Sequence, residues 1–77
     1  MSTEHPLIAE FPALRNKIHE LKVKDSHFAR LFTEYHEVDH ELHRIEQEIE
    51  TPSDSYVEEL KKKRLHLKDQ LYTLLNK

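Results

Sequence analysis

The stretch that decides the fold is FARLFTEYHEVDHELHRIEQEI, residues 28–49. Its apolar side chains recur in steps of three and four residues. They are Phe28, Leu31, Tyr35, Val38, Leu42, Ile45 and Ile49. This unbroken heptad pattern places one apolar seam along a single face of a long α-helix. With Asp25 or Ser26 as its N-cap, the helix is predicted over about residues 26–50.

A second helix with the same rhythm follows a turn-forming cluster at residues 51–54. Its apolar positions are Val57, Leu60, Leu67, Leu71 and Leu74. They predict a helix over about residues 55–76, and a turn of about four residues makes two helices antiparallel. The sequence therefore predicts an all-α fold, with an antiparallel coiled-coil helical hairpin over residues 25–77.

The N-terminal residues carry a shorter pattern. Pro12 suits the first position of a helix, and Leu14, Ile18 and Leu21 follow at helical spacing. We therefore expect a short helix over residues 12–24, with residues 1–11 as a tail before it.

The apolar end of the hairpin is the predicted interaction surface. It comprises Leu14, Ile18, Leu21, Phe28, Phe32, Tyr72 and Leu75. Two helices alone bury little apolar surface, so this end is expected to be covered by the short helix, by a second copy of the chain, or by both. The expected partners are thus the chain itself, as a dimer or larger oligomer, or an unknown protein with a complementary helix.

Folding the chain at the turn predicts which charges meet. The inter-helix pairs are Asp39–Lys68, Glu46–Lys61 and Glu41–Lys63, with Arg64 beside Glu41 or Glu46. Exposed ion pairs are worth only ~0–1 kcal/mol each, so we expect them to fix the register more than the stability. Acidic partners for the basic run at residues 61–64 argue against a nucleic-acid site there.

Composition narrows the class of protein. The 77 residues are 36% hydrophobic and 35% charged, with no glycine, no cysteine and a net charge of −3. The absence of cysteine excludes disulfides, thiolate metal sites and thiol catalysis, and the negative charge disfavours nucleic acid and anionic membranes. The sequence shows neither a secretory signal nor an apolar run of ~18 residues, so we expect a cytoplasmic protein.

The motif HEVDH, residues 36–40, matches the H-E-x-x-H pattern of zinc proteases. Because Val38 belongs to the seam, His36 and His40 are expected to point outward, and His43 lies too far along the helix to share one ion with both. These three histidines are weak metal candidates, and no catalytic residue or cofactor is predicted. The favoured function is a non-enzymatic structural or interaction module; the alternative is a weak metal- or pH-responsive binder acting through these histidines.

Three segments of the chain resemble the YdcH-like family of small bacterial proteins, a domain of unknown function. They are FPALRNKIHELKVKD, HFARLFTEYHEVDHELHRIE and VEELKKKRLHLKDQL, residues 11–25, 27–46 and 57–71, and the resemblance as a whole covers Phe11 to Leu75. The blocks at residues 38–41 and 67–69 are the most specific. The resemblance implies a small helical hairpin in the bacterial cytoplasm, and it implies no activity.

Overall fold

The computed structural model describes residues 5–48 and 51–77, and within them the chain is helical with no strand. The elements are α1 (Pro6–Glu10), the 3₁₀ turn η1 (Pro12–Leu14), α2 (Arg15–Lys24), α3 (Ser26–Glu46) and α4 (Asp54–Leu75). The predicted all-α class is confirmed. In the described part of the chain, no helix is long and apolar enough to cross a membrane.

The long helices begin at side-chain caps. The Asp25 carboxylate accepts hydrogen bonds from the backbone N–H groups of His27 and Phe28, at 3.0 and 3.1 Å. Ser53 caps α4 by accepting from the Tyr56 N–H at 3.3 Å. These bonds satisfy backbone donors that have no partner inside the helix.

Helix α3 ends earlier than the expected position near residue 50. Its last residue is Glu46, and Glu48 adopts the left-handed conformation with φ of 61°. A left-handed residue just beyond the last turn is a common way to end a helix, and glutamate fills that position in a chain without glycine. Ile49, the last predicted seam residue, lies outside the described residues.

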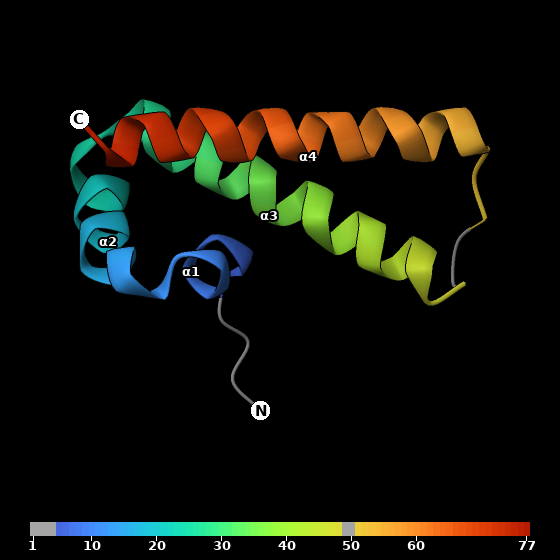
Figure 1. Ribbon diagram of the computed structural model, residues 1–77, viewed down its shortest axis with the longest axis horizontal. Coiled ribbons are helices and arrows are strands. Elements are labelled where there is room, and N and C mark those ends of the chain that lie inside the picture. The colour runs from blue at the N-terminus through green and yellow to red at the C-terminus, as the bar shows by residue number, and fades with distance from the viewer. Residues whose placement is uncertain (1–4, 49–50) are drawn as a thin grey trace.

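Helices α3 and α4 run side by side in opposite directions, and they diverge toward the segment that connects them (Figure 1). The predicted seam is buried from Phe28 to Leu42, whereas Ile45 and Val57, nearer the connection, are only partly buried. The best-packed part of the pair is therefore the end where α3 begins and α4 finishes. Helix α2 lies across this end (Figure 1).

The expected tail contains a helix. Residues Pro6–Glu10 form α1, and they bury Leu7 completely and Ile8 to 6% exposure. The prediction of a tail over residues 1–11 is corrected for this segment. Five residues are too few to show helical periodicity or to hold a helix alone, so α1 depends on tertiary burial that local sequence does not reveal.

Candidate functional site

The histidines of HEVDHELH line a groove rather than an open face. His36, His40 and His43 border a groove of about 650 Å³ that α1, α3 and α4 enclose. The side chains themselves are exposed, as their positions in the heptad predict. The difference from the prediction comes from α1, which lies beside this flank of α3 and supplies the opposite wall.

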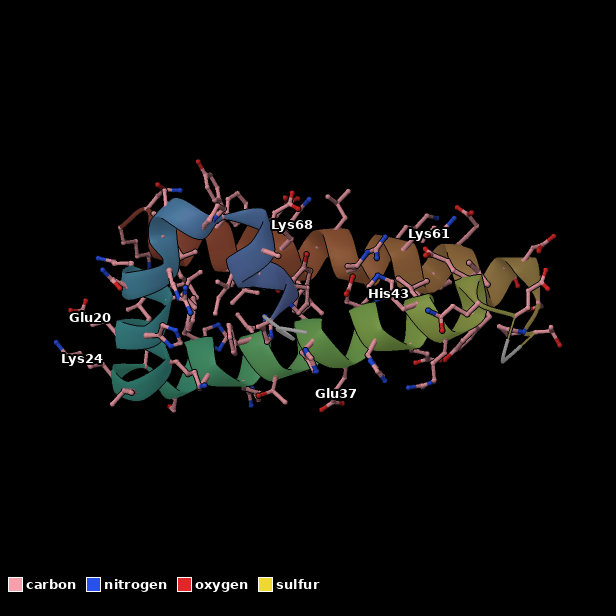
Figure 2. The ribbon with its side chains drawn as sticks, turned by 90° about the horizontal axis from the view of Figure 1, so that it is seen from below. Glu20, Lys24, Glu37, His43, Lys61 and Lys68 are labelled. Carbon is pink, nitrogen blue, oxygen red and sulfur yellow. The ribbon has the colours of Figure 1, made fainter. Side chains whose placement is uncertain are left out.

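The groove lacks the arrangement of a zinc protease. The rings of His36 and His40 stack with centroids 6.1 Å apart. Glu37 points to the opposite side of α3 from His43, so it cannot serve as a base for an ion held in the groove (Figure 2). Over residues 5–48 and 51–77, no three histidine, aspartate or glutamate side chains are grouped so that they could hold a metal ion.

Two ion pairs cross the groove, and they differ from the predicted ones. Arg64 donates to the Asp39 carboxylate at 2.9 Å, and Asp39 is only 13% exposed. Lys68 pairs with Glu10 of α1 at 3.3 Å. The predicted Asp39–Lys68 pair is therefore wrong: Arg64, one turn earlier on α4, pairs with Asp39, and Glu10 of α1 supplies the carboxylate that Lys68 contacts.

The other predicted pairs are also corrected. Among the described residues no ion pair joins Glu46 to Lys61 or Glu41 to Lys63, and Arg64 pairs with Asp39 rather than with either glutamate. The Tyr56 hydroxyl instead donates a hydrogen bond to the Glu41 carboxylate.

Burial sets the protonation of Tyr35, at the base of the groove. Burial raises the pKa of the Tyr35 hydroxyl above its ordinary value of 10.0, and the nearby carboxylates of Asp39 and Glu10 raise it further. The hydroxyl therefore stays protonated at neutral pH and cannot act as a base. With both carboxylates engaged by Arg64 and Lys68, the charged groups of the groove hold helices together.

His5 is the residue of this region that the sequence analysis missed. It is the N-cap of α1, and its ring stacks on Phe32 with centroids 3.6 Å apart. The only available signal was the dipeptide His5-Pro6, since proline at the first helical position marks a helix start. Desolvation by burial lowers the pKa of His5 from 6.5 to about 4.

The predicted interaction surface is mostly internal. Ile18, Phe28, Phe32 and Leu75 are buried, Leu14 and Leu21 are partly buried, and Tyr72 is 46% exposed with its ring stacked on Phe11. As a docking surface for another molecule this set is corrected, because α1 and α2 of the same chain cover it. The exposed large apolar side chains of the described residues are Val23, Tyr56, Leu65 and Tyr72.

Comparisons with known proteins identify relatives but no activity. The family described as "Protein of unknown function (DUF465)" matches residues 28–75. The chain is 34% identical over 65 residues to "Uncharacterized protein YdcH" of Escherichia coli, which covers 84% of this chain and 88% of the relative. The protein of the same name from Shigella flexneri matches to the same extent. No solved structure matches the chain. The chain therefore belongs to the DUF465 family, with YdcH among its relatives.

Proposed function

We propose that the chain is a non-enzymatic interaction module, in which α3 and α4 form an antiparallel hairpin of the coiled-coil type and one flank of α4 binds a second copy of the chain. The steps of three and four residues and the burial of Leu31, Val38, Leu60 and Leu67 support the hairpin. The ion-paired charges of the groove and the protonated hydroxyl of Tyr35 support a structural role.

The observation that carries the proposal is the exposed apolar flank of α4. Leu65 and Tyr72 are 55% and 46% exposed. They lie seven residues apart, which is about two turns, so they share one side of the helix. Phe11 stacks on the Tyr72 ring with centroids 5.0 Å apart and enlarges the patch. Two large apolar side chains exposed on the same side of one helix favour docking more than an isolated apolar residue does.

A second copy fits this flank because the flank is complementary to itself. When two α4 helices cross antiparallel about a two-fold axis between residues 68 and 69, Leu65 faces the partner's Tyr72. Asp69 and Lys68, the latter paired with Glu10 of its own chain, then lie on either side of the axis. Self-complementarity of this kind is the requirement for a two-fold symmetric dimer.

The size of the patch sets the expected affinity. Side chains of this size, about half exposed, offer roughly 200 Å² per protomer, well below the ~800 Å² per partner of a stable interface. We therefore expect weak association, with a Kd on the order of 10–100 µM or weaker.

Sedimentation equilibrium over about 10 µM to 1 mM tests this association. Leu65→Glu is expected to raise the dimer Kd at least about tenfold, because it places a carboxylate in the apolar contact. Val23→Glu is the matched control, because Val23 is 85% exposed and lies on α2, away from the flank. The dimer Kd of this variant should equal that of the wild type. A wild-type chain that is monomeric at 1 mM, or equal Kd values for Leu65→Glu and wild type, would refute the proposal.

Cross-linking tests the position of the axis in the same dimer. The chain has no cysteine, so one introduced thiol gives an unambiguous product. Asp69→Cys lies beside the proposed axis and is expected to form a disulfide-linked dimer under mild oxidation. Val23→Cys, equally accessible but distant, should not do so at the same concentration. Equal yields from both variants would contradict the two-fold pairing.

A further inference from the structure

Both ring nitrogens of His5 hold α1 in place. Nδ1 accepts a hydrogen bond from the Leu7 N–H at 3.1 Å, and Nε2 lies 2.8 Å from the carbonyl oxygen of Phe32. An acceptor at Nδ1 and a donor at Nε2 define one neutral tautomer. A second proton would have to sit on Nδ1, where it would face the Leu7 N–H. The geometry therefore admits only the neutral ring.

The surroundings of His5 also oppose a second proton. Burial of the ring against Phe32 removes water from it, and His36, with its ring centroid 5.0 Å away, and Lys22 of α2 add positive charge. The hydrogen bond to the Phe32 carbonyl and the charge of Asp39, both on α3, act in the opposite direction and raise the pKa, but the effect of burial is larger. The Tyr35 ring is 6.2 Å away and uncharged at neutral pH. The remaining charge on α1, Glu10, is paired with Lys68.

Helix α1 has few other anchors. Five residues cannot form a stable helix alone, so its structure depends on docking. The docking rests on the burial of Leu7 and Ile8, the Glu10–Lys68 pair at the surface, and the two bonds of His5. A second proton on Nδ1 removes the N-cap bond from the Leu7 N–H and sets two N–H groups against each other. The bond from Nε2 to the Phe32 carbonyl is lost when α1 then moves away from α3.

We propose that α1 undocks in mild acid. A second proton on the His5 ring detaches α1 from α3 and exposes Phe32 together with Leu7 and Ile8. The rest of the helical core stays folded. The chain would then expose apolar surface in acid that it covers at neutral pH.

The direction of the effect follows from proton linkage. His5 has a pKa of about 4 when α1 is docked and an ordinary histidine value of 6.5 when it is released. The docked state thus binds fewer protons, so docking is strongest above about pH 6.5 and weakens as the pH falls toward 4. Because the ring is only partly buried, we expect the docking equilibrium to fall by about 10- to 100-fold across this window.

Amide hydrogen exchange measured by NMR tests the release. The N–H groups of Ile8 and Ala9 both bond to the His5 carbonyl within α1. After correction for the intrinsic pH dependence of exchange, their protection is expected to fall about 10- to 100-fold between pH 7 and pH 4.5. Protection of Leu71, which is fully buried on α4, should not change. Equal protection of α1 at both pH values would overturn the proposal.

Two asparagine variants identify the responsible histidine. His5→Asn keeps a side-chain oxygen to cap Leu7 but cannot take up a proton, so its α1 protection should no longer depend on pH. His36→Asn changes the neighbouring exposed histidine and should retain the loss of protection in acid. A His5→Asn chain that repeats the wild-type loss would refute the role of His5.

If α1 of the His5→Asn variant is undocked at every pH, the titration of the His5 ring in the wild-type chain tests the proposal instead. Histidine ¹⁵N shifts are expected to show the proton on Nε2 at pH 7, and a titration midpoint well below 6.5. A His5 titration midpoint near 6.5, with the α1 amides still protected from exchange, would contradict the proposed undocking. The same measurement is independent of dimer formation, since it follows one ring within one chain.

Discussion

Ile18→Asp is expected to detach α2 and to remove most of the stability of the chain. Ile18 is fully buried on the face of α2 that packs into the core. Aspartate at this position loses the apolar burial and places a charge where no partner is available, which costs about 3–5 kcal/mol or more. A domain of this size has on the order of 4–12 kcal/mol in total, so the variant should be partly unfolded at 25 °C.

Urea unfolding followed by circular dichroism measures this loss. Val23→Asp is the matched control, since it makes the same change on the same helix at a side chain that is 85% exposed. Its free energy of unfolding should lie within about 0.5 kcal/mol of the wild type. An Ile18→Asp chain as stable as Val23→Asp would mean that α2 does not cover the core.

Phe28→Ala should have the next largest effect. Phe28 is the largest of the fully buried side chains, and its backbone N–H is one of the two held by the Asp25 cap. Its ring packs beside that of Phe32, with centroids 6.0 Å apart. Removing a buried phenylalanine ring costs about 3–5 kcal/mol, because it loses apolar burial and leaves a cavity.

The same urea titration provides the measurement and its control. Tyr72→Ala removes an aromatic ring that is 46% exposed and stacked on Phe11, and it should cost about 1 kcal/mol. The comparison rests on how much free energy of unfolding each of the two variants loses relative to the wild type. Losses of similar size for Phe28→Ala and Tyr72→Ala would contradict the placement of the core at the start of α3.

The long helices could be predicted because their information is local and repeated. The seam from Phe28 to Leu42 follows the heptad spacing, and every member is buried. The turn-forming cluster at residues 51–54 placed the start of α4 within one residue of its observed start at Asp54. Such features depend on neighbours three or four positions away, which a sequence displays directly.

The groove could not be predicted because it depends on α1. The pattern of five residues in α1 is too short to detect, and without α1 the histidine flank reads as an open surface. With α1 docked, Lys68 forms an ion pair with Glu10, and Arg64 forms one with Asp39. A register deduced from two ideal parallel helix axes also fails where α3 and α4 diverge, as the missing Glu46–Lys61 pair shows (Figure 1).

The apolar end illustrates a more general ambiguity. A sequence identifies Ile18, Phe28 and Phe32 as apolar side chains that need cover, but it does not say which molecule provides the cover. The structure assigns these side chains to the chain's own core and leaves Leu65 and Tyr72 outside it. The candidate site for a partner therefore moves from the end of the helix pair to the flank of α4.

The central claim is that the N-terminal segment of each chain covers its own α3 and α4. Isotope-filtered NOE spectroscopy at pH 7, on a sample that mixes labelled and unlabelled chains, tests it most directly. We predict ring-to-ring NOEs within one chain between His5 and Phe32, and between Phe11 and Tyr72, because their ring centroids lie 3.6 and 5.0 Å apart. The absence of these NOEs, or their presence only between labelled and unlabelled chains, would contradict the account.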